Sequence, residues 1–226
     1  MSENLGFKFK EPRSLPVILL LDTSGSMSSN GNINVLNTAV REMLADFASQ
    51  DSNDISIDVA IYTFGPDVKQ FIPFKSSIQA IEEYTDMNAN GGTPLGETLE
   101  LVKNQLIEDK EALPSRSYRP MVILVSDGMP NDDWETPLER FCNEGRSSKC
   151  FRMALSIGNE EGDPSYEMLR TFASNDEMVF SADSAAKIKK FFKFVTISTV
   201  RRSQSQNPNV VAQKVEDIYD DDDDIF

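Results

Sequence analysis

Five oxygen-bearing side chains stand in three separate segments of the chain, and two of these segments directly follow long apolar runs. They are Asp22, Ser24 and Ser26 in DTSGS, Thr93 in GGTPLG, and Asp127 in VSDG. Carboxylate and hydroxyl oxygens suit the hard cations Mg²⁺, Mn²⁺ and Ca²⁺ better than zinc or copper. We therefore predict a divalent-metal site with Mg²⁺ as the first choice and Mn²⁺ or Ca²⁺ as alternatives.

The chemistry of this set also suggests how an ion would bind. Mg²⁺ usually keeps several waters, so the two acids can hold it through water while the three hydroxyls bind it directly. Such a set neutralises little of the ion's charge, which leaves one coordination position open to a carboxylate from outside. Each residue also has a structural interpretation, because serine and threonine cap helices and Asp127 suits a turn. A plain fold does not need all five at strand ends.

Composition excludes several other kinds of site. The 226 residues contain no histidine, which rules out Ser-His-Asp and Cys-His nucleophile systems and His-containing zinc sites. The formal charge of -15 argues against binding of nucleic acid, which requires basic surface. Cys142 and Cys150 are too few for a disulfide framework, and we interpret them as reduced thiols.

The apolar run 15–21 is too short to cross a membrane. It ends on Asp22 and not on the small-residue cleavage site of a signal peptide. We therefore expect a cytoplasmic protein with no membrane partner.

The elements that must position these residues alternate between strands and helices. Continuous apolar runs predict central parallel strands covered on both faces, and spacings of three and four predict helices. The segment 67–74 contains Pro73 and predicts an antiparallel edge strand. Expected strands are 15–21, 55–64, 67–74, 121–128, 151–158 and 177–181; expected helices are 33–47, 93–106, 134–142, 165–173 and 184–200. This order predicts a doubly wound α/β sheet with helices on both faces.

We expect three regions along the chain. Residues 1–14 form a polar leader, 15–200 form one α/β domain, and 201–226 form a flexible acidic tail that ends in VEDIYDDDDDIF. The tail has two interpretations: a solubilising end, or a short linear motif in which apolar residues and acids alternate and bind a basic, partly apolar partner.

Two smaller expectations concern side chains outside the proposed site. Thr93 and Pro94 occupy the positions of an N-cap and the first residue of a helix. Asp132, Asp133 and Trp134 have two interpretations: a rim that contacts a partner near the ion with Trp134 as its anchor, or, as we expect, a cap by Asp133 for the helix that follows, with Trp134 packed against that helix. In the last predicted helix we expect Phe194 to be half exposed, since three phenylalanines of FFKF cannot share one face.

The combination of DTSGS, GGTPLG and VSDG resembles the metal-ion-dependent adhesion site (MIDAS) of von Willebrand factor A domains, over about residues 15–200. The resemblance implies a single Rossmann-like domain with a mostly parallel sheet. It also implies that Ser24, Ser26 and Thr93 bind the ion directly, whereas Asp22 and Asp127 act through water. An interaction module of this kind is not an enzyme.

Three segments resemble a narrower group, the TerY-like proteins of bacteria. They are LPVILLLDTSGSM, RPMVILVSDGMPNDDW and FFKFVTISTV. TerY-like proteins are stand-alone cytoplasmic A domains associated with tellurium resistance and stress responses, and are often encoded near a kinase and a phosphatase. The resemblance implies an adaptor whose protein partner supplies an Asp or Glu to the metal, with that kinase or phosphatase as a candidate.

An enzyme is the alternative. An Asp after a first strand also resembles the haloacid-dehalogenase phosphatases, in which Asp22 would be the nucleophile and SDGMPNDD would hold Mg²⁺. Those enzymes place a second Asp two residues later as the acid and base. Ser24 stands there instead, and a serine does not readily protonate a leaving group.

Overall fold

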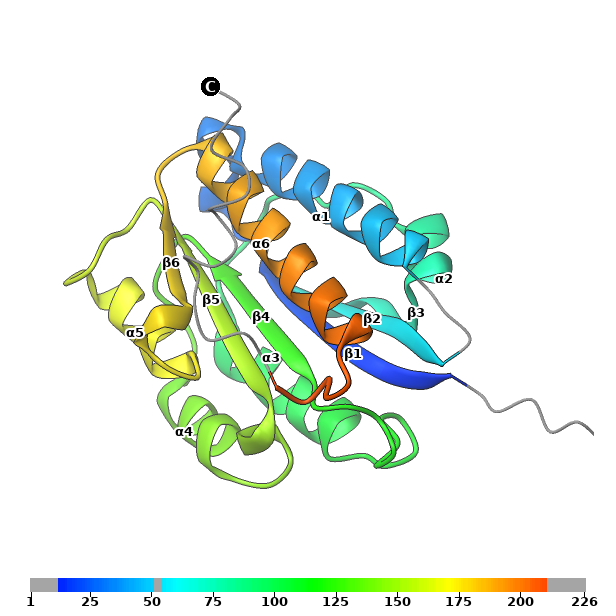
Figure 1. Cartoon of the computed structure of the whole chain (residues 1–226). Coiled ribbons are helices and arrows are strands. Elements are labelled where there is room, and N and C mark those ends of the chain that lie inside the picture. Colours follow the sequence, from blue (N-terminus) through cyan, green and yellow to red (C-terminus); the bar gives the residue numbers. More distant parts are fainter. Residues whose placement is uncertain (1–11, 51–53, 211–226) are drawn as a thin grey trace, which may run out of the picture.

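The computed structural model describes residues 12–50 and 54–210. A six-stranded sheet with the order β3-β2-β1-β4-β5-β6 forms its centre (Figure 1). All neighbouring strands are parallel except β3, which pairs antiparallel with β2 at one edge, as the sequence predicts. The strands are Arg13–Asp22 (β1), Ile55–Phe64 (β2), Val68–Ser76 (β3), Met121–Ser126 (β4), Phe151–Ile157 (β5) and Val179–Ala182 (β6).

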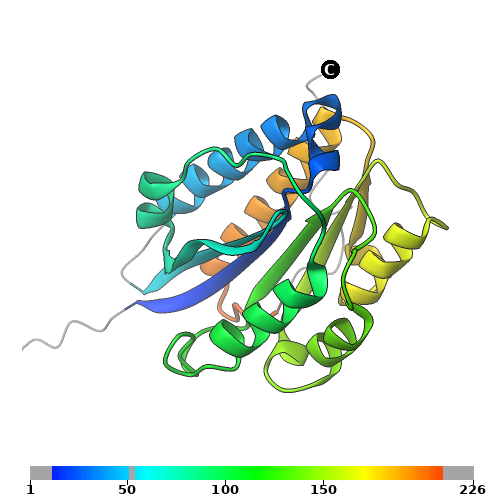
Figure 2. The same cartoon turned by 180° about the vertical axis from the view of Figure 1, so that it is seen from behind.

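Helices cover both faces of this sheet. Helices α1 and α6 pack against each other on one face, with α2 beside α1, while α3, α4 and α5 lie on the other (Figures 1 and 2). Their bounds are Asn32–Ser49 (α1), Ser77–Glu83 (α2), Leu95–Val102 (α3), Glu135–Asn143 (α4), Pro164–Phe172 (α5) and Ala185–Gln204 (α6). This is the three-layer arrangement predicted for the chain. The short helix α2 has no counterpart among the predicted elements.

The two apolar strands β1 and β4 are buried along almost their whole length because they lie in the middle of the sheet. Their register pairs Leu21 with Val125, so the next residues, Asp22 and Ser126, lie level at the carboxyl edge. Ligands of open α/β sheets bind beyond this edge. The register therefore places Asp22 and Asp127 in neighbouring positions.

Helix α3 begins at Leu95, one residue later than predicted, and Pro94 takes the N-cap position. The expected cap by Thr93 is therefore wrong. Beyond Val102 the chain continues through a π-helical turn, Lys103–Ile107, which hydrophobic spacing alone does not reveal.

The expected half exposure of Phe194 is also wrong, because only 2% of this residue is exposed. Its ring lies 5.2 Å from that of Phe180 on β6, and Phe180 also contacts Phe191 at 5.1 Å. Since α6 packs against both the sheet and α1, it buries a much wider arc than a surface helix does.

Both ends of the domain extend beyond the predicted bounds. Strand β1 includes Arg13, whose backbone pairs with Ile55, and α6 continues to Gln204. Arg202 is buried and donates to the carbonyl of Pro208. The first ten residues of the expected tail are therefore partly packed, and its acidic run lies outside the described residues.

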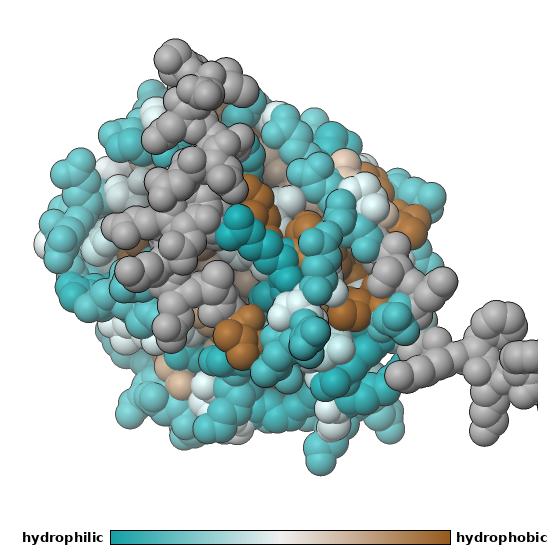
Figure 3. Space-filling model, viewed as in Figure 1, coloured by the Kyte–Doolittle hydropathy of each residue, from teal (hydrophilic) through white to brown (hydrophobic). Residues whose placement is uncertain are grey.

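The described surface is largely polar. Figure 3 shows mostly hydrophilic residues on the α1 and α6 face, with separate apolar spots. Among residues 12–50 and 54–210 the exposed large apolar side chains are Ile78, Met129 and Val210. Within these residues no helix is both long and apolar enough to cross a membrane.

Replacing the buried ring of Phe194 tests the packing of α6. Phe194→Ala should lower the free energy of unfolding by about 3–5 kcal/mol, the usual range for a buried phenylalanine. Urea denaturation followed by circular dichroism measures the change. The exposed Lys189, on the same helix, gives the control Lys189→Ala, expected to change stability by less than about 0.5 kcal/mol. Equal effects of the two substitutions would contradict the packing.

Candidate metal centre

Asp22 is a fully buried carboxylate at the end of β1. One carboxylate oxygen accepts the backbone N–H of Ser24 at 2.8 Å, and the other accepts the hydroxyl of Ser126 at 2.6 Å. These two bonds fix the orientation of the side chain.

A chain of hydroxyl groups continues from this carboxylate. The Oγ atoms of Ser24 and Ser26 lie 2.9 Å apart, and Ser26 Oγ donates to Asp127 Oδ1 at 2.7 Å. Four of the five predicted ligands thus lie in one connected cluster. The hydroxyls come from the loop and short 3-10 helix that follow β1, whereas Asp127 follows β4.

Thr93 lies in the loop that borders this cluster. The amide of Gly25 donates to the carbonyl of Gly91 at 3.0 Å, and the amide of Asn90 donates to the carbonyl of Thr23 at 2.8 Å. Thr93 itself is 8% exposed. Backbone bonds therefore bind its loop to the segment that holds the two serines, although within the described residues its hydroxyl makes no hydrogen bond to the cluster.

Two glycines of this loop, Gly91 and Gly92, lie so close to neighbouring segments that a side chain would not fit. Gly91 has a φ of +76°, and a Cβ there would lie 2.4 Å from the backbone of Pro66. A Cβ on Gly92 would lie 2.2 Å from the side-chain nitrogen of Asn131. The absence of a side chain at both positions thus lets the loop pack closely against neighbouring loops.

Ser126 and Asn131 escaped the sequence analysis, and Asp132 entered it only as part of a rim that contacts a partner. Ser126 holds Asp22, Asn131 Oδ1 accepts the amide of Thr93 at 3.0 Å, and Asp132 accepts the amides of Gly96 and Glu97 at 3.1 and 3.0 Å. Asn131 and Asp132 thus fasten the Thr93 loop and the start of α3 to the loop after β4. The hydroxyl of Ser126, directly before Asp127, was the available signal.

The neighbouring residues Asp133 and Trp134 also differ from expectation. Helix α4 begins at Glu135 with Trp134 as its N-cap residue and has no side-chain cap, so the expected cap by Asp133 is wrong. Trp134 is partly buried against the core, as predicted.

Burial controls the electrostatics of the cluster. It raises the pKa of Asp22 to about 6, although hydrogen bonds from Ser126 and Ser24 oppose the shift. Burial likewise raises the pKa of Asp127, against the hydrogen bond from Ser26. Two acids that resist ionisation side by side favour a neighbouring cation, because a positive charge would remove the cost of ionising them.

The donor set fits a divalent ion of the hard class. It offers only oxygen, from two carboxylates and three hydroxyls, and the described residues contain no group of three or more His, Cys, Asp or Glu side chains placed to hold a metal. The cluster therefore differs from acid-rich calcium sites and from zinc sites built of His and Cys ligands. Both described cysteines, Cys142 and Cys150, are free thiols, as predicted.

Comparison with known proteins places this geometry in a family. The model of the von Willebrand factor type A domain matches residues 17–194. The chain belongs to the von Willebrand factor type A family. Such A domains are typically non-enzymatic modules that mediate protein–protein interactions. The sequence matches no curated protein.

Solved structures confirm the A-domain fold. The chain is similar to the pilus adhesin SpaC from Lactobacillus rhamnosus GG, with 16% identity, 84% of this chain and 31% of SpaC covered, and a TM-score of 0.69. It is also similar to proximal thread matrix protein 1 from the mussel byssus in a structure with a zinc-occupied MIDAS motif, with 21% identity, 82% and 45% covered, and a TM-score of 0.61. The chain thus spans less than half the length of either protein.

A third similar structure is itself a single domain of about this extent. The von Willebrand domain of the type V pili tip protein Mfa5 from Porphyromonas gingivalis shares 9% identity, with 83% of this chain and 97% of that chain covered and a TM-score of 0.59. At these identities the likeness establishes the fold alone.

The raised pKa of Asp22 predicts a pH-dependent effect of Mg²⁺. Without metal, the folded state holds the Asp22 proton more tightly than the unfolded chain, so its contribution to stability falls as pH rises from the ordinary pKa of an aspartate, 3.8, towards 6. An ion binds the ionised form, so stabilisation by Mg²⁺ should grow over the same range. Thermal melts with and without Mg²⁺ should show a Tm increase at about pH 7.5 that is largely lost at about pH 4.5. A Tm increase independent of pH would contradict this.

Proposed function

We propose that this A domain is a non-enzymatic, divalent-metal-dependent protein interaction module. Ser24, Ser26 and Thr93 bind the ion directly, Asp22 and Asp127 hold it through water, and a partner protein supplies an Asp or Glu to the open position. The hydrogen-bonded cluster around buried Asp22 is the observation that supports this most. It gathers oxygen donors in one place and leaves the negative charge of their carboxylates uncompensated.

Mg²⁺ is the proposed ion, with Mn²⁺ and Ca²⁺ as alternatives, since hydroxyl and carboxylate oxygens favour hard cations. The mussel protein has zinc in its motif, so zinc belongs in any comparison of affinities.

Surface chemistry near the cluster supports a protein partner. Met129 follows Asp127 by two residues and is 42% exposed, which offers an apolar contact next to the ion. Methionine adapts to varied partners because its side chain is flexible and polarisable. A carboxylate that reaches the ion would bring its neighbouring side chains over Met129.

We further propose, from the TerY-like resemblance, a cytoplasmic adaptor in a bacterial stress-response or tellurium-resistance system. A kinase or phosphatase of that system is the candidate partner.

The phosphatase alternative gains little from the geometry. Asp22 has no exposed surface and is held by Ser24 and Ser126, whereas a nucleophile must reach its substrate. Turnover of a generic phosphate ester by the wild type, lost in Asp22→Asn, would establish the enzyme instead.

Removing one ligand should weaken binding of the ion without unfolding the domain. Thr93→Ala and Asp22→Ala should each lower Mg²⁺ affinity at least about tenfold, equivalent to about 1.4 kcal/mol. Titration calorimetry with Mg²⁺, Mn²⁺, Ca²⁺ and Zn²⁺ measures the affinities, and circular dichroism checks the fold. Thr38→Ala, at an exposed threonine of α1, is the control. Loss of the folded state in both ligand variants would contradict the proposal.

Partner recognition should depend on the same ligand. Wild type and Thr93→Ala, each in Mg²⁺ and in EDTA, serve as baits in lysate of the native cells. A protein retained only by wild type with Mg²⁺ is the expected result, and replacing its Asp or Glu residues then identifies the one that reaches the ion. The same proteins retained in all four conditions would mean that the metal is structural.

A further inference from the structure

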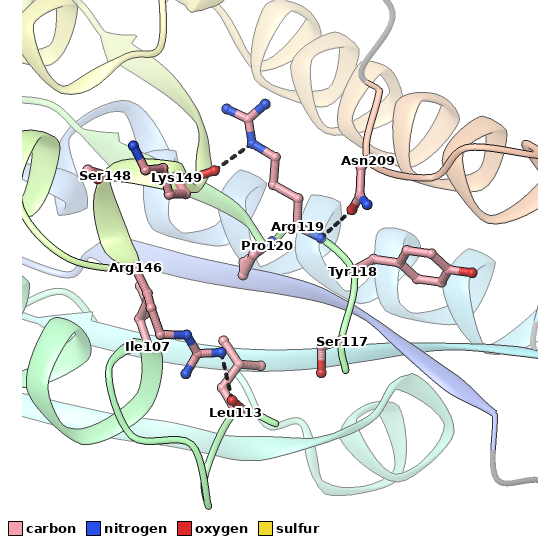
Figure 4. A pocket seen from close by; sticks show the side chains of 10 residues that line it. All are labelled: Ile107, Leu113, Ser117, Tyr118, Arg119, Pro120, Arg146, Ser148, Lys149 and Asn209. Atoms are coloured by element: carbon pink, nitrogen blue, oxygen red, sulfur yellow. Dashed lines mark hydrogen bonds between the residues drawn. The ribbon is translucent and has the colours of Figure 1, made fainter. Parts of the chain in front are cut away.

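A cavity of about 540 Å³ lies at the amino-terminal edge of the sheet, opposite the metal centre (Figure 4). Pro120 and Lys149, which precede β4 and β5, line it together with the apolar side chains of Ile107 and Leu113. Its size is typical of ligand sites.

The charge of this cavity is opposite to that of the chain. Among the described lining residues, three are cations, Arg119, Arg146 and Lys149, and none is acidic. Among the residues that the structure describes, none of the three forms an ion pair with a carboxylate. Glu108, which accepts the amide of Ser147, is paired with Lys103 instead. The positive charge of the cavity is therefore not neutralised by the described domain.

Backbone carbonyls hold two of these cations in place. Arg146 donates to the carbonyl of Leu113 at 2.8 Å, and Arg119 donates to that of Lys149 at 2.5 Å (Figure 4). A neutral carbonyl fixes a guanidinium without cancelling its charge, so the site is preorganised for an anion.

The C-terminal end of the described chain is fastened to the rim of this cavity. Asn209 lines it and accepts the amide of Arg119 at 2.7 Å. Arg202, 2% exposed, donates to the carbonyls of Pro208 and Arg119, while its Nη1 has no hydrogen-bond partner within the described part of the chain. Burial of this guanidinium, next to Arg119, lowers its pKa to about 10. Burying a charged guanidinium costs free energy, and a nearby anion would offset that cost.

The sequence that follows Asn209 supplies such an anion. Residues 215–226, VEDIYDDDDDIF, contain seven carboxylates and place Ile218 and Tyr219 between them. Acids match the three cations of the cavity, and the apolar side chains match the partly exposed Tyr118 and Pro120, while Ile107 and Leu113 lie beneath the surface. Only five residues separate the rim residue Asn209 from this segment, which gives the tethered segment a high effective concentration at the cavity.

We propose that residues 215–226 bind in the basic cavity of their own chain, with carboxylates against Arg119, Arg146 and Lys149. The cavity is thus a binding site for an acidic peptide, and the tail of the same chain is its occupant. This site is independent of the metal centre, because the two lie at opposite edges of the sheet.

Zero-length cross-linking of the full chain tests this docking. A carbodiimide joins carboxylates to lysine amines in direct contact, and mass spectrometry maps the links. We expect the dominant link to join Lys149 to residues 216–224 of the same chain. Arg146→Glu, which leaves Lys149 in place, should reduce it about fivefold, as should about 0.5 M NaCl, in which charges on the surface are strongly screened.

Two controls keep the result interpretable. Arg140→Glu changes an exposed arginine of α4 outside the cavity and should leave the link unchanged. In a variant with Asp220 through Asp224 replaced by Asn, which alters no described residue, Glu216 and Asp217 stay reactive, and their link to Lys149 should fall as it does in Arg146→Glu. Links spread evenly over the exposed lysines, or concentrated on Lys187 and Lys189 of α6, would overturn the proposal, and so would links between chains.

Discussion

The buried carboxylate of Asp22 is the constraint on which the site depends. It lies at the end of the central strand, without exposed surface, and its pKa of about 6 shows that the fold resists its charge. Burying an acid is costly unless hydrogen bonds or a cation compensate. Ser24 and Ser126 supply the hydrogen bonds, and a divalent ion would supply the charge. The raised pKa and the ligand set are thus consequences of one placement.

The rest of the domain keeps the neighbouring segments at this position. Parallel register brings the ends of β1 and β4 level, while Asn131 and Asp132 connect the loop after β4 to Thr93 and the start of α3. Because these contacts are backbone bonds and side-chain caps, the donors are held by the scaffold and not by one another alone. The proposed function therefore needs the ion for recognition and not for the fold.

Prediction from the sequence succeeded where the residue types of a short segment determine its place in the fold. Wholly apolar runs predicted the central strands, and Asp22, Ser24, Ser26 and Asp127, predicted as ligands, lie in one hydrogen-bonded cluster. It failed where contacts with residues distant in the sequence determine burial or helix capping. Phe194 is buried because β6 and α1 flank α6, and Asp132 caps a helix that begins 37 positions earlier in the chain, at Leu95. Arg202, in the expected tail, is buried because a carbonyl beyond the helix accepts its guanidinium. Local patterns contain none of these contacts.

The central claim is that the five oxygen donors surround one divalent ion, and diffraction from crystals grown with Mn²⁺ tests it most directly. Anomalous scattering locates manganese without reference to the protein. The account predicts a peak within about 2.5 Å of Ser24 Oγ, Ser26 Oγ and Thr93 Oγ1, with Asp22 and Asp127 one water further away. A saturated crystal without a peak there, or with its only peak elsewhere, would contradict the account.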